Sequence, residues 1–231
     1  MSQNKIKILD HGFIKLLNVA GPTGKAKDTD PAQCARISFN NFDSERTQEQ
    51  DFKLNEYLIK NKHTTPLEMV ETWWEMKIPI FIARQFIRHR TATVNEVSAR
   101  YVTLPEEWYI PEFVGGKAVS NKQGQEDNLS EKTQHWLKVT LQNACHYSYE
   151  CYKDAIEEGV APEHARMFLH VNHYTHWIWK QDLHNLFHFL SLRLHSHAQV
   201  EARIAAQAMY DLLKLELPEL VRLFDEYRRI K

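Results

Sequence analysis

One stretch, residues 67–89, limits the fold most, because it joins a predicted strand directly to a predicted buried helix. The segment LEMVETWWEMKI is rich in branched and aromatic residues, which favour strands. Pro79 follows it, and proline suits the first turn of a helix. The segment PIFIARQFIRH is apolar nearly all round until Arg84 and Gln85, which predicts a helix buried in the core.

The remaining segments predict further short strands and helices around this pair. Residues 6–19 alternate and break at Gly12, which indicates one or two strands. Residues 171–179 are strand-like, and the weakly hydrophobic segment 115–130 is predicted to be a mobile loop. Helices are predicted over residues 44–63, 130–158, 161–169, 182–194 and 198–217, with Gly159 and Pro218 as stop signals. No internal repeat or linker occurs, so we predict one α+β domain over residues 1–231.

Composition narrows the class of protein. A formal net charge of −1 provides no global basic field for nucleic acid, so any anion site must be local. Cys34, Cys145 and Cys151 include no CxxC pair, which argues against a disulfide framework and a structural zinc site. Cys145 and Cys151 lie in an apolar helical pattern and are predicted core residues. No apolar run approaches the ~20 residues of a membrane span, and we predict a soluble cytoplasmic protein.

Fixed hydrogen-bond donors gather directly after the predicted buried helix, in RHRTATVNEVSARY, residues 88–101. Arg88, Arg90 and Arg100 carry permanently charged forks that suit phosphate or carboxylate, and Glu96 is the sole carboxylate of the stretch. One interpretation is a solvated basic loop that pairs with acids elsewhere. The position at the exit of a buried segment favours an anion-binding site instead, because solvated charge runs usually lie on exposed faces.

Two further groups are weaker indications. The segment HTTPLE, residues 63–68, is in itself a turn with an extended entry into the strand. His184 and His188 stand one helical turn apart, as zinc-binding pairs can, with Asp182 as the nearest further ligand. The alternative is that their ring nitrogens bond the backbone. No HExxH motif occurs, and we predict no metal site.

The stretch from Arg88 to Tyr101 resembles the signature R-H-R-x-x-S-x-N-E-x-S-x-R-Y of the flavin-dependent thymidylate synthases. Thr93 stands where that family usually has serine, and it keeps a hydroxyl. CARISF, HTTPLE, APEHARMFL and LHNLFHFLSLRLHSHAQVEAR resemble other segments of the same family, so the similarity covers most of the chain. The matching signature residues are Arg88, His89, Arg90, Asn95, Glu96, Ser98, Arg100 and Tyr101.

The resemblance implies a reaction, its cofactors and an assembly. Members of the family convert dUMP to dTMP, taking the methylene from 5,10-methylenetetrahydrofolate and the hydride from FAD that NADPH has reduced. They are homotetramers with FAD and nucleotide sites at subunit interfaces. Their fold is mixed α/β, with a twisted, largely antiparallel sheet flanked by helices.

Carried over residue by residue, the resemblance implies two sets of binding residues. Some relatives have asparagine at the positions of Asp182 and His188 and arginine at that of His184. The dUMP site would use Gln85, Phe86, Ile87, Arg88, Glu96, Val97, Ser98, Ala99, Arg100, Arg166 and Arg193. The FAD site would use Thr65, Arg88, His89, Arg90, Glu96, Asp182, Leu183, His184 and His188.

The family comparison makes Arg193 the predicted catalytic residue, as a cation beside the pyrimidine N3/O4 edge that favours an electron-rich ring. The chain has no G-x-G-x-x-G, which excludes the Rossmann mode of FAD binding. Ser98 is predicted to bind rather than attack, because the sequence identifies no base to activate it. No cysteine shows an activating environment, so the cysteine mechanism of the classical synthase does not fit.

Two alternative functions remain, and each predicts a property that can be measured. A metal-dependent hydrolase built on Asp182, His184 and His188 would contain stoichiometric zinc or iron. A nucleic-acid-binding module built on the arginines would bind with strong salt dependence. The length of the matching signature favours the synthase over both.

Overall fold

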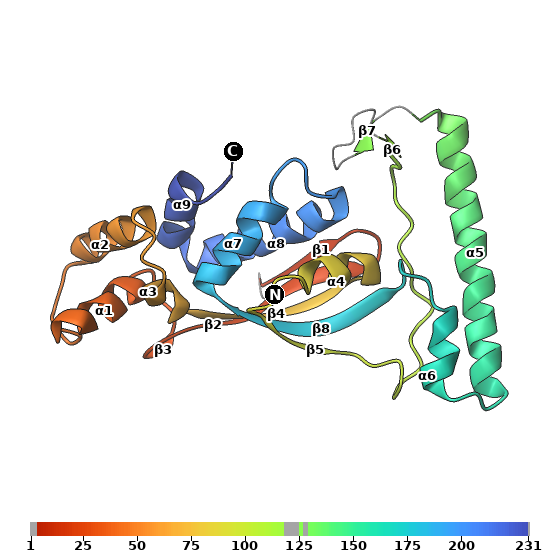
Figure 1. Cartoon of the computed structure of the whole chain (residues 1–231), viewed down its shortest axis with the longest axis horizontal. Coiled ribbons are helices and arrows are strands. Elements are labelled where there is room, and N and C mark those ends of the chain that lie inside the picture. The colour runs from red at the N-terminus through yellow and green to blue at the C-terminus, as the bar shows by residue number, and fades with distance from the viewer. Residues whose placement is uncertain (1–3, 118–124, 127–128, 231) are drawn as a thin grey trace.

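The structure, a computed structural model, describes residues 4–117, 125–126 and 129–230 and is centred on an antiparallel sheet (Figure 1). The strand order is β1-β2-β4-β8-β5, β3 pairs with β2, and every pairing is antiparallel. This confirms the predicted α+β class. A separate pair joins β6 to β7. The strands are β1 (Lys5–Ile8), β2 (Gly12–Gly21), β3 (Gly24–Lys25), β4 (Glu71–Pro79), β5 (Thr93–Glu96), β6 (Gly116–Lys117), β7 (Gln125–Glu126) and β8 (Tyr174–Asp182).

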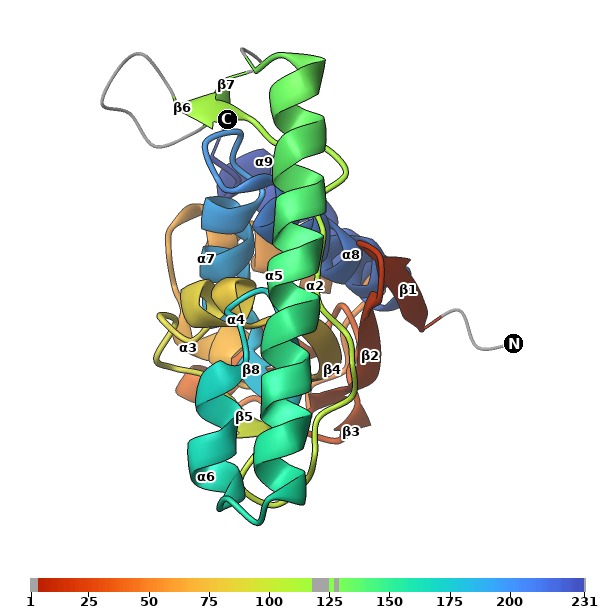
Figure 2. The same ribbon diagram turned by 90° about the vertical axis from the view of Figure 1, so that its right-hand side faces the viewer.

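Helices α4, α7 and α8 lie on one side of the sheet, while α1 to α3 lie beyond one end of it and α5 and α6 beyond the other (Figure 1). Figure 2 shows the long helix α5 from its outer side, with α6 beside it. The helices are α1 (Asp30–Arg36), α2 (Gln48–Lys60), α3 (Thr65–Glu68), α4 (Ile80–Phe86), α5 (Glu131–Glu157), α6 (Pro162–Ala165), α7 (Leu183–Arg193), α8 (Val200–Glu216), α9 (Pro218–Tyr227), and the 3₁₀ helices η1 (Ile37–Phe39) and η2 (Arg166–Phe168).

Strands β4 and β8 form the centre of the sheet from distant parts of the chain. Thr72 pairs with Gln181, 109 residues further on, and its hydroxyl donates to the Gln181 carbonyl over 2.7 Å. Side chains on β4 alternate between buried and half-buried. Glu75 points to the other face of the strand and accepts hydrogen bonds from Lys15 and His176, each over 3.0 Å. The sheet therefore has one apolar face under the helices and one face with cross-strand ion pairs.

Aromatic side chains join the helices to the sheet. The rings of Phe86 (α4) and Phe189 (α7) lie 4.7 Å apart, and Phe189 lies 5.1 Å from Trp179 (β8). All three are fully buried, and burial of each such side chain stabilises the fold by about 1.5–3 kcal/mol. This contact holds the end of α4 against α7. It therefore also fixes the start of the arginine-rich stretch relative to the residues of α7.

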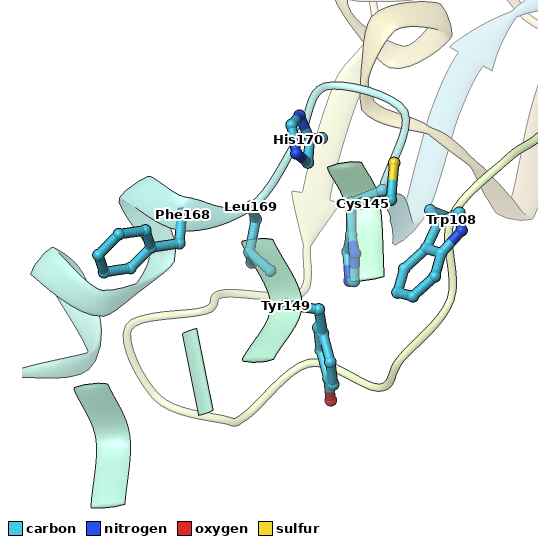
Figure 3. Close-up of a pocket in the computed structure, with 7 residues that line it drawn as sticks. Trp108, Cys145, Tyr149, Phe168, Leu169 and His170 are labelled. Atoms are coloured by element: carbon cyan, nitrogen blue, oxygen red, sulfur yellow. The ribbon is translucent and has the colours of Figure 1, made fainter. Parts of the chain in front are cut away.

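A second, smaller core attaches α5 to the sheet. Trp108, Cys145 and Tyr149 surround a cavity of about 10 Å³, as Figure 3 shows. The Asn172 side-chain amide donates to the Tyr109 carbonyl over 2.9 Å and to the Cys145 sulfur over 3.2 Å. The cavity has the size of about one water molecule. This region is therefore packing between α5 and two loops, and burial raises the pKa of the Cys145 thiol.

Several element boundaries differ from the prediction. Helix α2 begins at Gln48 rather than at residue 44, because Thr47 and Gln50 form a capping box. Their side chains accept each other's backbone N–H groups, over 3.3 and 3.1 Å. The predicted extended entry at residues 63–68 is wrong, since Thr65 starts the short helix α3. Cys145 is buried as predicted, whereas Cys151 is half-buried, which corrects its assignment to the core.

Several elements were not predicted, including the two-residue strand β3. Helices α1 and α9 are absent from the sequence interpretation, and residues 93–96 form the edge strand β5 within a stretch that was read as a loop. Of the predicted mobile loop, residues 116–117 and 125–126 pair as strands, and residues 118–124 and 127–128 lie outside the described residues. Among the described residues, no helix has the length and apolar character that crossing a membrane requires.

Candidate active site

A pocket of about 350 Å³ lies beside the edge strand β5, and we call it the β5 pocket. Its size falls within the range of small-molecule sites. Residues 96–99 reach it from the end of β5, while Arg166 comes from η2 and Thr175 from β8. Five residues predicted to bind the substrate therefore share one pocket. The full lining is Ile80, Glu96, Val97, Ser98, Ala99, Leu104, Arg166, Leu169 and Thr175.

Polar groups in and around the β5 pocket are held by local hydrogen bonds. The Thr175 hydroxyl donates to the Glu96 carboxylate. The Ser98 hydroxyl accepts the N–H of Arg100 over 3.3 Å. Arg100 forms a 3.6 Å ion pair with Glu163, and the side chain of Arg166 donates to the Glu163 carbonyl over 3.3 Å. Both arginines are exposed, so their contacts with Glu163 are weak enough for an anion to replace them.

The wall of the β5 pocket is attached to α5 through two tyrosines. The Tyr149 hydroxyl donates to the Leu104 carbonyl over 2.9 Å, and the Leu104 N–H donates to the Tyr152 hydroxyl over 3.1 Å. Both backbone polar groups of Leu104 are thus satisfied by one helix. No sequence motif pointed to these tyrosines. Their spacing of three residues on an amphipathic helix was the available signal.

A second set of predicted residues meets where α4 ends against α7. Arg193, the last residue of α7, donates from Nη2 to the Gln85 carbonyl over 3.1 Å, and the same atom lies 3.3 Å from His89 Nε2. The His89 ring lies 6.0 Å from that of His188. We call Gln85, His89, His188 and Arg193 the α4–α7 group. Gln85 also donates to Gln199 over 2.6 Å, which ties this group to the loop before α8.

Burial and nearby charges shift the pKa values of two members of the α4–α7 group, His89 and Arg193. Burial, together with the charges of the nearby Arg193 and His188, lowers the pKa of His89 to about 4. His89 is therefore neutral near pH 7, and its Nε2 accepts from the guanidinium. Burial also lowers the pKa of Arg193, and its Nε is a buried donor without a hydrogen-bond partner among the described residues. An unpaired buried donor is costly, which makes this atom a candidate for ligand contact.

The remaining predicted site residues are either exposed to solvent or buried in the core. Arg88 and Arg90 are exposed and have no ion pair or hydrogen bond among the described residues, so they are available to an anion. Ile87 is also exposed. Phe86 and Leu183 are fully buried, so a ligand can reach them only through their backbone. The Leu183 N–H is already used by the Val70 carbonyl, over 2.8 Å.

Asp182 and His184 are both engaged in the fold. Asp182 caps α7 and accepts from the Asn185 N–H over 2.9 Å and from its side-chain amide over 2.7 Å. His184 Nδ1 lies 3.3 Å from Nη2 of Arg228, at the end of α9. Among the described residues, no group of three His, Cys, Asp or Glu side chains is arranged to hold a metal ion. Of the two histidines on α7, His184 thus contacts the Arg228 guanidinium and His188 the ring of His89, rather than a shared metal ligand.

A larger cleft of about 1030 Å³ lies between α1, α2 and α3, and we call it the α2–α3 cleft. Thr65, predicted to contact the flavin, lines it together with His63. Arg36 also lines it and forms an ion pair with the buried Asp51. The sequence signals were the CARISF and HTTPLE segments, which both contribute lining residues. The other lining residues are Pro22, Cys34, Ala35, Ile37, Ser38, Phe39, Phe42, Leu54, Tyr57, Leu58, Thr64, Pro66 and Met69.

The chain is similar to known proteins in sequence and in fold. The sequence profile of the Thy1 family, described as thymidylate synthase complementing protein, matches residues 21–219. The chain is 40% identical over 227 residues to a flavin-dependent thymidylate synthase of Gluconobacter oxydans, covering 96% of this chain and 73% of that one. It is 43% identical over 223 residues to a flavin-dependent thymidylate synthase of Thermus thermophilus, covering 96% of this chain and 78% of that one.

A solved structure shares the fold over almost the whole chain. The UMP/dUMP methylase PolB from Streptomyces cacaoi, bound with 5-Br dUMP, superposes with a TM-score of 0.85 at 25% identity. The match covers 97% of this chain and 99% of that one. The long signature, the profile match and the identity to curated relatives agree, and this chain belongs to the flavin-dependent thymidylate synthases.

Proposed function

We propose that the β5 pocket of this methyltransferase binds dUMP and that the α4–α7 group acts on the bound pyrimidine, converting dUMP to dTMP. The observation that carries the proposal is the convergence of Glu96, Val97, Ser98, Ala99 and Arg166 on one pocket of about 350 Å³. These residues come from two segments about 70 positions apart in the chain. Their meeting in one pocket is what a nucleotide site requires.

Charges in the β5 pocket favour one orientation of the nucleotide. Glu96 is a carboxylate held by Thr175, so it repels a phosphate and can accept a sugar hydroxyl. Arg166 also lines the pocket, and Arg100 lies near it because Glu163 engages both arginines. A phosphate beside them would replace the exposed pair between Arg100 and Glu163 with charge-assisted hydrogen bonds. The nucleotide phosphate is therefore expected beside the two arginines.

The donors around the α4–α7 group fit a flavin dinucleotide. A pyrophosphate needs positively charged donors without competing carboxylates, and Arg88 and Arg90 are exposed and unpaired among the described residues. When bound and reduced by NADPH, FAD supplies the hydride of the reaction. Arg88, His89, Arg90, Glu96, His184 and His188 would hold it, with Asp182 and Leu183 contributing through the start of α7.

Arg193 is the proposed catalytic residue. The Gln85 carbonyl and neutral His89 both accept from Nη2, which fixes the guanidinium at the end of α7. Its Nε is buried and has no partner among the described residues, so no hydrogen bond within the protein would be lost if this group turned toward the pyrimidine edge. A fixed cation there stabilises negative charge on the ring and makes C5 nucleophilic. Ser98 binds the nucleotide in this scheme and forms no covalent bond.

The assembly that we propose is based on predicted site residues that are missing from the lining of the β5 pocket. Its lining does not include Gln85, Arg88 or Arg193, which lie on the α4–α7 side. We therefore propose a homotetramer with shared sites, in which a second copy brings these residues to the nucleotide. The chain acts as one domain over residues 1–231, supported by strands from both halves in a single sheet. The formal net charge of −1 supports a cytoplasmic enzyme without a nucleic-acid partner.

The α2–α3 cleft is the proposed site of 5,10-methylenetetrahydrofolate. Its lining includes the aromatic side chains of Phe39, Tyr57 and His63, which suit a flat heterocycle. Thr65, a predicted flavin contact, lines the same cleft, so the folate would lie near the cofactor. Phe39 is 86% exposed, which leaves an apolar ring free to pack on a ligand or a second copy.

The visible absorption spectrum of the purified protein tests the proposed function. Spectra are taken before and after anaerobic NADPH, and again after dUMP with methylenetetrahydrofolate. Oxidised-flavin bands that bleach with NADPH and return only with both substrates support the proposal. A colourless protein that takes up no added FAD contradicts it, and metal analysis would then test the hydrolase alternative.

A further inference from the structure

Arg228, just after α9, is a half-buried guanidinium without an acidic partner among the described residues. Two other arginines of this segment are paired. Arg229 forms a 3.0 Å ion pair with Asp225, and Arg222 is bound by two glutamates. The side chain of Arg228 instead approaches His184, with 3.3 Å between its Nη2 and the ring Nδ1. A partly buried cation without a counter-charge is unfavourable unless an anion binds there.

Once Arg228 and His184 are paired, the polar groups that they can still offer to a ligand are all hydrogen-bond donors. A guanidinium cannot accept a hydrogen bond, so His184 Nδ1 must be the unprotonated nitrogen of a neutral ring. Burial and the charge of Arg228 both lower the pKa of His184, which keeps the ring neutral. The proton then lies on Nε2, where it can be donated. Together the two side chains offer a cation and a ring N–H.

The nearby carboxylates do not neutralise this pair. The charge of Asp182 raises the pKa of His184, but its two oxygens accept from Asn185. The charge of Glu68 on α3 also raises the pKa of His184. Within the described part of the chain, Glu68 forms no ion pair with Arg228. His184 belongs to the first turn of α7, where the helix dipole favours an anion. The cation, the ring N–H and the helix dipole therefore all favour negative charge at this position.

We propose that Arg228, together with His184, binds a phosphate group of the flavin cofactor. This inference rests on the proposed function, in which the start of α7 contacts FAD. Arg228 lies beyond residues 21–219, the part of the chain that the family profile matches. A residue 44 positions from His184 thus supplies the charge that the start of α7 itself lacks.

The test is the affinity of flavin-depleted protein for FAD, measured by quenching of flavin fluorescence at low and at high salt. Arg228→Gln is expected to weaken FAD binding at least about tenfold at low salt. Its affinity is also expected to fall less steeply with salt than that of the wild type, because one ionic contact is missing. Arg229→Gln is the matched control, since Arg229 is the next residue and its charge is already paired with Asp225.

Several outcomes decide the inference. FAD affinity of Arg228→Gln within twofold of wild type overturns it, and so does an equal loss in Arg229→Gln, which would indicate a structural effect of α9. If Arg228→Gln does not fold, Arg228→Lys decides, with a loss of at least threefold supporting the contact and no loss overturning it. Wild-type protein that binds no FAD would overturn the proposed function itself, and this inference with it.

Discussion

Nη2 of Arg193 lies 3.3 Å from Nε2 of His89, and this contact joins the end of α7 to the signature stretch 104 residues earlier. The same nitrogen donates to the Gln85 carbonyl. Both partners are neutral acceptors, so the guanidinium is fixed in direction without losing its charge. A cation held in this way differs from one in a salt bridge, because its field remains available to a ligand.

Arg193→Ala is expected to lower turnover by about 10²–10³-fold, the usual loss when one preorganised donor at a developing charge is removed. The flavin should remain bound, because other residues hold it. Steady-state kcat is measured together with the flavin content of each preparation. Arg203→Ala is the matched control, since Arg203 bonds the Ser196 carbonyl over 3.1 Å and none of the four residues of the α4–α7 group. Near-normal turnover of Arg193→Ala would remove this residue from the catalytic role.

The depressed pKa of His89 predicts a pH dependence of stability. The unfolded chain protonates His89 below about pH 6.5, whereas the folded chain does so only below its pKa of about 4. Between these values the unfolded state binds more protons, so the free energy of unfolding decreases as pH falls from about 6.5 to about 4. Buried His173, whose pKa is also about 4, contributes in the same direction.

His89→Gln is therefore expected to reduce the loss of stability across this window, without abolishing it. The measurement is urea unfolding at about pH 7 and about pH 4.5, comparing the two free energies for each variant. His164→Gln is the control, because this histidine is exposed on α6. An unchanged difference in His89→Gln would show that His89 does not stay neutral in the folded protein.

The sequence predicted the structure best where a local pattern of residues matches the way those residues pack in the core. The branched and aromatic run ending at Ile78 is a strand, and the boundary at Pro218 is where α8 gives way to α9. Residues 96–99 of the signature line one pocket together with Arg166, and their role in binding the substrate stays a prediction. These features depend on residues that are close in sequence or on one long motif.

Contacts between distant segments could not be predicted in the same way. The sequence contains no pattern that links Arg228 to His184 or Tyr152 to Leu104, because each contact depends on how a helix packs in three dimensions. Strand β5 was missed for a similar reason. It is a short, mostly exposed edge strand, and its pairing with β8 decides its conformation more than its own propensity does.

Ser98→Ala is expected to retain turnover, with kcat within about tenfold of wild type and a raised KM for dUMP. The Ser98 hydroxyl accepts the Arg100 N–H over 3.3 Å, and among the described residues no basic side chain bonds it. Without an adjacent base, a serine is a poor nucleophile. The assay measures kcat and KM at saturating folate and NADPH. Complete loss of turnover with normal dUMP binding would indicate a covalent role.

Tyr152→Phe is expected to raise the KM for dUMP severalfold and to leave kcat much less affected. The change leaves the buried N–H of Leu104 without its acceptor, which costs about 1–3 kcal/mol of stability. Leu104 lines the β5 pocket, so a looser backbone there weakens binding of the nucleotide. Steady-state kinetics and urea unfolding are measured on the same preparations.

Tyr210→Phe is the matched control for this prediction. Its hydroxyl donates to Asp225 over 2.6 Å, so the variant also loses one hydrogen bond from a largely buried tyrosine, but between α8 and α9. A general loss of stability would raise the KM equally in both variants. A rise confined to Tyr152→Phe would show that α5 positions the pocket wall, and equal values in the two variants would contradict that role.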